Sequence, residues 1–128
     1  MKFIADTHAF IWFVTDSPQL SVRAKELFES PESERLLSMA SLWEIAVKAN
    51  LGKLAFARPL EQFIPEQLAL NYIRLLDISI SHVLQVGTLS LHHRDPFDRM
   101  IIAQSLVENL PVLSADEAFD AYGVKRIW

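Results

Sequence analysis

The sequence predicts an α/β fold with a mostly parallel central sheet of about five short strands. Short apolar runs alternate along the chain with segments that begin at helix-capping residues, and such alternation is typical of strands joined by crossover helices. The runs are apolar at successive positions, as in strands that are buried on both faces. The chain has no internal repeat, low-complexity tract or linker, so we expect one domain over residues 1–128.

The amino-acid composition excludes several classes of function. The chain has 128 residues, of which 51% are hydrophobic, and this is enough for a proper core. It has no cysteine, which excludes disulfides, thiolate zinc sites and cysteine nucleophiles. The net charge of −4 argues against a basic face that binds nucleic acid, but allows a nucleic-acid enzyme with its acids at one metal site. Without a secretory leader or a long apolar run, we expect a soluble, cytoplasmic protein with no membrane contact.

The first predicted strand covers residues 2–5 and stops at Asp6, which can also cap the helix that follows through residues 9–13. Ser21 caps a second short helix that ends at about Glu29. Both assignments depend on an oxygen-bearing side chain placed directly before an apolar helical segment.

The second predicted strand covers residues 36–39. Ser41 and Glu44 then have the spacing of a capping box, which predicts a helix that begins there and ends at Gly52. Residues 59–71 are also predicted to be helical, in two pieces because of the proline within them.

The third predicted strand covers residues 73–78, and Ser79 or Ser81 opens a helix to about Leu89. The remaining predicted elements are a helix over 96–108, a strand over 111–113, a short helix that follows a second serine-to-glutamate box at 114–117 and ends at 122, and an edge strand over 125–128.

The helix predicted from residue 96 carries an unusual carboxylate. Asp95 is a good N-cap, and Pro96 suits the first helical position. Asp98 shares its face with Ile101 and Ile102, so its charge needs compensation near a buried helix start. The helix dipole supplies part of this compensation, and a metal ion or an arginine would supply the rest.

Four carboxylates follow a strand or lie in a predicted first helical turn: Asp6, Glu44, Asp98 and Asp116. Taken singly, each is explained by helix capping. Taken together, they lie at the edge of a parallel sheet where strands end and helices begin, so all four would face one crevice. Like charges this close raise one another's pKa or require a cation. Oxygen ligands of this kind indicate Mg²⁺ or Mn²⁺.

Hydroxyl groups are predicted at the same edge, on Thr7, Ser38, Ser41 and Ser114, where they could order the carboxylates or bound waters. Such a site suits hydrolysis of a phosphate ester with one or two metal ions, because a metal lowers the pKa of bound water and offsets charge on the phosphoryl group.

Five further residues, close in sequence to Asp98, can each be interpreted in two ways. Asp95 is better explained by capping than by function. Arg94 and Arg99 either form salt bridges or contact a substrate phosphate. His92 and His93 lack the second member of a usual metal-ligand spacing, so we interpret them as surface or phosphate-contacting residues.

Four segments in this order resemble the PIN domain, and within it the VapC-type toxins of toxin–antitoxin pairs. The segments are Asp6-Thr7-His8-Ala9, Ser41 to Lys48 followed by Leu51-Gly52-Lys53-Leu54, Arg94 to Arg99 followed by Ile102-Ala103-Gln104, and Ser114-Ala115-Asp116 followed by Phe119 and Tyr122-Gly123. Each segment is weak evidence alone, but together they span essentially the whole chain.

The resemblance implies a three-layer α/β/α fold and a metal-dependent endoribonuclease that acts on RNA as a toxin. It implies that Asp6, Asp98 and Asp116 hold Mg²⁺, with Mn²⁺ as an alternative, and that Glu44 completes the catalytic set, often through water. Thr7, Ser114, Asp95, Arg94 and Arg99 are then candidates for supporting or substrate contacts. The implied partners are an antitoxin protein, whose tail covers the active site, and a second copy of the chain in a homodimer.

Other readings fit less well. A haloacid-dehalogenase-type phosphatase needs a second aspartate where this chain has His8, and a phosphoryl-accepting receiver domain needs adjacent acids where Ala5 precedes a lone Asp6. The remaining alternative is a non-enzymatic α/β interaction module whose acidic residues only cap helices.

Overall fold

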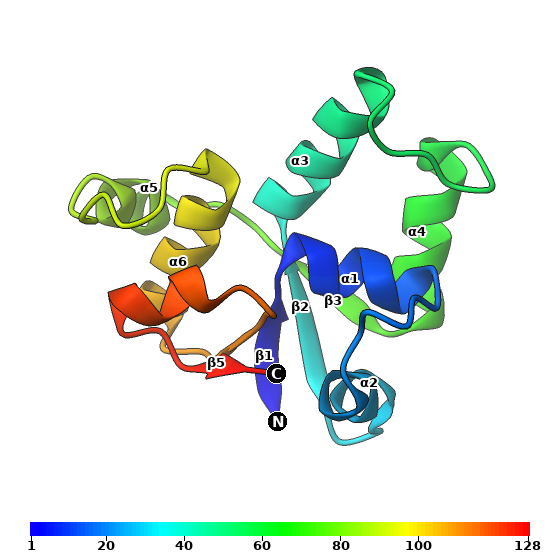
Figure 1. Ribbon diagram of the computed structural model, residues 1–128, viewed down its shortest axis with the longest axis horizontal. Coiled ribbons are helices and arrows are strands. Elements are labelled where there is room, and N and C mark those ends of the chain that lie inside the picture. The colour runs from blue at the N-terminus through cyan, green and yellow to red at the C-terminus, as the bar shows by residue number, and fades with distance from the viewer.

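The protein forms one parallel sheet covered by helices on both faces (Figure 1). The computed structural model describes residues 1–128. The strand order is β3-β2-β1-β4-β5, and every neighbouring pair is parallel. The elements are β1 (Lys2–Ala5), α1 (Thr7–Val14), α2 (Val22–Glu29), β2 (Glu34–Ser38), α3 (Met39–Asn50), α4 (Leu60–Leu70), β3 (Ile73–Leu76), α5 (Ile80–Val86), α6 (Pro96–Glu108), β4 (Val112–Leu113), the 3₁₀ helix η1 (Glu117–Tyr122) and β5 (Arg126–Ile127).

Two hydrophobic cores, one on each face of the sheet, make the fold a three-layer α/β/α structure. Alternate residues of β1 point in opposite directions, so Phe3 packs with α1 and α2 while Ile4 packs with α6 and η1. In Figure 1, α1, α2 and α4 lie on one side of the strands and α5, α6 and η1 lie on the other. The predicted fold class is therefore confirmed, including the parallel sheet of five short strands.

Parallel pairing brings the carboxyl ends of the strands to one edge of the sheet. Ala5 at the end of β1 is in register with Leu37 on β2 and with Leu113 on β4. The residues that follow β1, β2 and β4 therefore lie beside one another, although they are far apart in the sequence.

Helix α3 begins earlier than predicted. Its N-cap is Ser38, whose hydroxyl accepts a hydrogen bond from the Ala40 amide at 3.0 Å. The hydroxyl of Ser41 is buried and accepts a hydrogen bond from Thr7 Oγ1 at 2.9 Å instead. The predicted capping box between Ser41 and Glu44 is therefore wrong, and Glu44 lies in the second turn of the helix.

Two other helix predictions need correction. Helix α4 is continuous through Pro65. Proline has no amide proton, so the carbonyl of Glu61 loses its hydrogen bond within the helix. Both residues are exposed, so water can replace this bond. The N-cap of η1 is Asp116, which accepts from the Ala118 amide at 2.9 Å, so the predicted box that starts at Ser114 is also wrong.

None of the helices combines the length and the apolar character that a membrane-spanning segment requires.

Candidate active site

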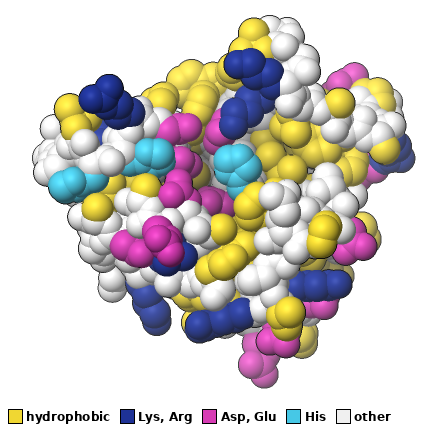
Figure 2. Space-filling view, viewed as in Figure 1, with side chains coloured by type: hydrophobic (Ala, Val, Ile, Leu, Met, Phe, Trp, Pro, Cys, Tyr) yellow, Lys and Arg dark blue, Asp and Glu magenta, His cyan; other side chains and the backbone are white.

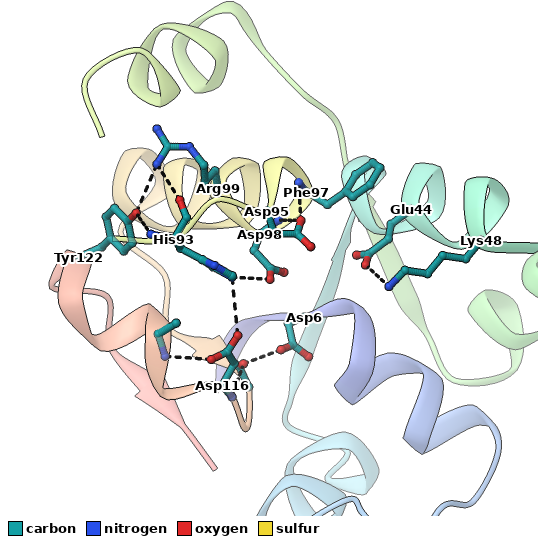
Figure 3. A network of polar contacts seen from close by, with 12 residues as sticks. Asp6, Glu44, Lys48, His93, Asp95, Phe97, Asp98, Arg99, Asp116 and Tyr122 are labelled. Atoms are coloured by element: carbon teal, nitrogen blue, oxygen red, sulfur yellow. Dashed lines mark hydrogen bonds and ion pairs between the residues drawn. The ribbon is translucent and has the colours of Figure 1, made fainter. Parts of the chain in front are cut away.

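The structure brings the four predicted carboxylates together at the carboxyl edge of the sheet (Figure 3). Asp6 joins β1 to α1, Glu44 belongs to α3, Asp98 to the first turn of α6, and Asp116 follows β4. Their charges interact: Asp116 raises the pKa of Asp6, while Glu44 and Asp6 raise that of Asp98. Figure 2 shows acidic side chains gathered between α3 and α6, with histidines on either side.

Asp6 is the most strongly held of the four acids. Its side chain is buried, and Oδ1 accepts a hydrogen bond from the Ala9 amide at 2.7 Å, which caps α1 as predicted. Oδ2 accepts a hydrogen bond from the Ser114 hydroxyl. Burial raises the pKa of Asp6, although both hydrogen bonds act in the opposite direction. The carboxylate is thus fixed in place while its charge is poorly solvated.

The surroundings of Asp98 disfavour the charged form of its carboxyl group. Its pKa is raised from 3.8 to about 6, mainly by burial; the hydrogen bond from His93 lowers it, and the nearby charges of Asp95, Glu44 and Asp6 raise it. Its carboxylate accepts no backbone hydrogen bond at the start of α6, because Asp95 accepts both the Phe97 and the Asp98 amides, at 2.8 and 3.1 Å. Asp98 therefore has no capping role.

Glu44 is almost fully buried, with 2% of its side chain exposed. Its Oε2 forms an ion pair with Lys48 Nζ at 2.6 Å, one helical turn further on. Its Oε1 is buried and has no hydrogen-bond partner in the protein. A buried carboxylate oxygen without a partner is costly, so this atom indicates that something outside the protein completes the site.

Ser114 links two of the acids. Its hydroxyl donates to Asp6 Oδ2 and accepts from the Asp116 amide at 3.0 Å, so one side chain holds both positions. Asp116 itself has about half of its side chain exposed and faces solvent at the rim. Among the other predicted hydroxyls, that of Thr7 bonds to Ser41 and orders the junction of α1 with α3.

His93 belongs to the site, which the sequence interpretation missed. Its Nε2 lies 2.7 Å from Asp98 Oδ2 and 3.7 Å from Asp116 Oδ2. In this structure the neighbour of the Asp98 carboxylate is therefore a histidine, not the predicted arginine, and its hydrogen bond offsets only part of the effect of burial on the pKa of Asp98. The sequence position of His93 could have indicated its place in the site, because His93 lies in the loop that leads directly into the helix carrying Asp98.

Arg99 makes no ion pair with the acidic site. Its guanidinium donates to the carbonyls of Ser90 and His93, at 2.9 and 3.2 Å, and to the hydroxyl of Tyr122 at 3.3 Å. These contacts hold the loop before α6 in place. Arg94 is exposed and forms no salt bridge.

The donors present fit a divalent cation. One ligand atom each from His93, Asp98 and Asp116 can be chosen so that all three lie within 4.8 Å of one another. Asp6 lies close enough to both aspartates to interact with their charges. A cation would relieve the repulsion among these groups, and waters bound to it could donate to the free Oε1 of Glu44.

Solved structures with the same fold include a toxin–antitoxin complex from Klebsiella pneumoniae, with a TM-score of 0.66 at 17% identity and with 98% of this chain and 96% of that chain covered. VapBC2 from Rickettsia felis, bound to a promoter DNA fragment, has a TM-score of 0.70 at 14% identity, with 99% of this chain and 98% of that chain covered. VapBC-1 from nontypeable Haemophilus influenzae has a TM-score of 0.70 at 16% identity, with 99% and 97% covered. FitAcB from Neisseria gonorrhoeae has a TM-score of 0.66 at 18% identity, with 100% and 97% covered.

Sequence comparison assigns the family independently of these structural likenesses. No curated protein matches the chain. The PIN domain profile, however, matches residues 3–125, a range that contains every residue of the acidic site. With this match, the expectation drawn from the four sequence segments is confirmed, and the chain belongs to the PIN-domain family.

Proposed function

We propose that this protein is a divalent-metal-dependent endoribonuclease and the toxin of a toxin–antitoxin pair. The observation that carries the proposal is that two of the four acids, Glu44 and Asp98, cap no helix and yet are largely shielded from solvent, with 2% and 17% of their side chains exposed. Helix capping explains Asp6 and Asp116, but it does not explain why Glu44 and Asp98 lie beside them. A shared cation accounts for all four.

In the proposed enzyme, Asp6, Asp98 and Asp116 hold Mg²⁺, with Mn²⁺ as the alternative. The bound ion would supply a water of lowered pKa and offset charge on the phosphodiester. Ser114 fixes the carboxylate of Asp6 relative to Asp116, and the partnerless oxygen of Glu44 can accept a hydrogen bond from water in the site.

The proposed partners are RNA, an antitoxin and a second copy of the chain. Three findings support the toxin assignment: membership of the PIN-domain family, the sequence segments shared with VapC-type toxins, and a fold like that of chains solved in toxin–antitoxin complexes. Asp116 is exposed at the rim of the site, where a phosphodiester backbone could approach the acids, and Arg94, which directly precedes Asp95 in the sequence, is exposed to solvent.

The proposal is tested by isosteric neutralisation of single acids. We expect the parent protein to cleave RNA with Mg²⁺ or Mn²⁺ and to stop when EDTA is added. Asp98→Asn and Asp116→Asn should each lower the cleavage rate by at least about 100-fold, because each removes a metal ligand. Asn caps as well as Asp, so η1 stays intact in the second variant.

Asp16→Asn is the matched control, because it makes the same chemical change at an exposed turn residue whose positive φ of 52° suits Asn. This variant should cleave like the parent. If Asp98→Asn and Asp116→Asn also cleave like the parent, the catalytic assignment is wrong and the interaction-module alternative is favoured.

A further inference from the structure

We infer that His93 is a nitrogen ligand of the metal ion, and that it shifts the preference of the site from Mg²⁺ toward transition-metal ions. The inference rests on the proposed function, since it concerns the same ion. It adds a ligand of a different chemical type to a set that the sequence predicted as oxygen only.

The position of Nε2 carries the inference. It lies 2.7 Å from Asp98 Oδ2 and 3.7 Å from Asp116 Oδ2, and the ring is mostly buried, with 21% of the side chain exposed. Two ligands that bind one ion at about 2.1 Å and at right angles lie about 3 Å apart. The observed separations are on either side of this value, so small side-chain rotations would bring all three atoms to one ion.

The backbone of His93 is held at both its amide and its carbonyl, which fixes the position from which the ring enters the site. Its amide donates to Tyr122 Oη at 2.8 Å, and its carbonyl accepts from Arg99 Nη1 at 3.2 Å. The Tyr122 hydroxyl in turn donates to the carbonyl of Ser90 at 2.7 Å. Figure 3 shows Tyr122 and Arg99 on one side of this loop and the carboxylates on the other.

The neighbouring His92 has none of these features. It is exposed, and its ring packs edge-on against Tyr122, with ring centroids 5.2 Å apart. The pair therefore contains one histidine directed at the acids and one directed away from them, which provides a matched control within two adjacent positions.

An imidazole ligand has a predictable effect on ion choice. Mg²⁺ prefers oxygen ligands and retains several waters, whereas imidazole nitrogen favours transition-metal ions. Ligation requires the tautomer protonated on Nδ1, since Nε2 then offers its lone pair. We expect His93→Gln to weaken Mn²⁺ binding by at least about 10-fold and Mg²⁺ binding by less, so that the ratio of the two affinities falls.

The test is pulsed electron paramagnetic resonance of the intact protein loaded with Mn²⁺, combined with calorimetric titration of Mn²⁺ and Mg²⁺. The spectrum of the parent should show coupling of the ion to a directly bound ¹⁴N nucleus, and this coupling should change to that of ¹⁵N in protein made with ¹⁵N-histidine. The isotope comparison needs no substitution, so it holds even if a variant folds poorly.

The two histidine variants then identify the ligand. The nitrogen coupling should persist in His92→Gln and disappear in His93→Gln. Mn²⁺ that binds tightly to the parent without nitrogen coupling would overturn this inference and leave the proposed function standing. Coupling that survives in His93→Gln would also overturn it. Absence of any Mn²⁺ or Mg²⁺ binding to the parent would overturn the metal-dependent function as well.

Discussion

Asp98→Asn should stabilise the ion-free protein while removing its activity. Burial and neighbouring acids give Asp98 a pKa of about 6 in the fold, compared with an ordinary value of 3.8. A carboxyl group with a higher pKa in the folded protein binds its proton more tightly when folded, so its charged form opposes folding. Asparagine has nearly the same shape and no charge, and Asp98 has no capping role that the substitution could lose.

The expected gain follows from these two pKa values. At pH 7.5 they correspond to a destabilisation of about 3 kcal/mol, which the substitution removes. The penalty shrinks as the pH falls through 6 and disappears below 3.8, so at pH 4.5 the same calculation leaves about 1 kcal/mol. The side chain is only 17% exposed, so screening by solvent reduces these figures little.

The assay is urea unfolding at both pH values in EDTA, followed by the fluorescence of the three tryptophans. Asp16→Asn, which changes an exposed carboxylate, should differ from the parent by less than about 0.5 kcal/mol. The reasoning is refuted if Asp98→Asn is no more stable than the parent at pH 7.5, or if its advantage does not shrink toward pH 4.5.

Three further substitutions test the supporting contacts. Lys48→Met leaves the buried Glu44 without its ion partner and should lower the free energy of unfolding by about 1–3 kcal/mol in urea; an unchanged value would contradict the pairing. Ser114→Ala removes the hydroxyl donor to Asp6 and should cost about 1–3 kcal/mol in the same assay, whereas Ser114→Thr should largely restore stability. Tyr122→Phe frees the loop before α6 and should weaken Mn²⁺ binding about 10-fold by calorimetry, with an unchanged circular dichroism spectrum; equal affinity would exclude a positioning role.

The fold was predictable because local pattern and tertiary structure agree over most of the chain. The continuous apolar run of β1 indicated a strand buried on both faces, and Phe3 and Ile4 do enter different cores. Asp95 and Pro96 correctly marked the start of α6, because capping depends only on adjacent residues.

Two of the errors occurred where a serine had a tertiary partner. Ser41 and Ser114 both lie three residues before a glutamate, but each hydroxyl is buried and bonds to another segment of the chain, Ser41 with Thr7 and Ser114 with Asp6. A spacing rule cannot reveal a partner that is distant in sequence, so both predicted capping boxes were wrong.

The four acids of the site could be predicted from the sequence, but the presence of His93 beside them could not. Asp6 and Asp98 could be grouped because parallel strands end at one edge of a sheet. The place of His93 between Asp98 and Asp116 depends on the path of a loop, which Arg99 and Tyr122 hold through contacts that no local pattern encodes.

The most direct measurement is a crystal structure of the protein soaked in Mn²⁺, with anomalous diffraction used to locate the ion. The account predicts one strong peak, or two about 4 Å apart, within about 2.5 Å of carboxylate oxygens from Asp6, Asp98 and Asp116. No peak at saturating Mn²⁺, or a peak bound elsewhere on the molecule, would contradict it.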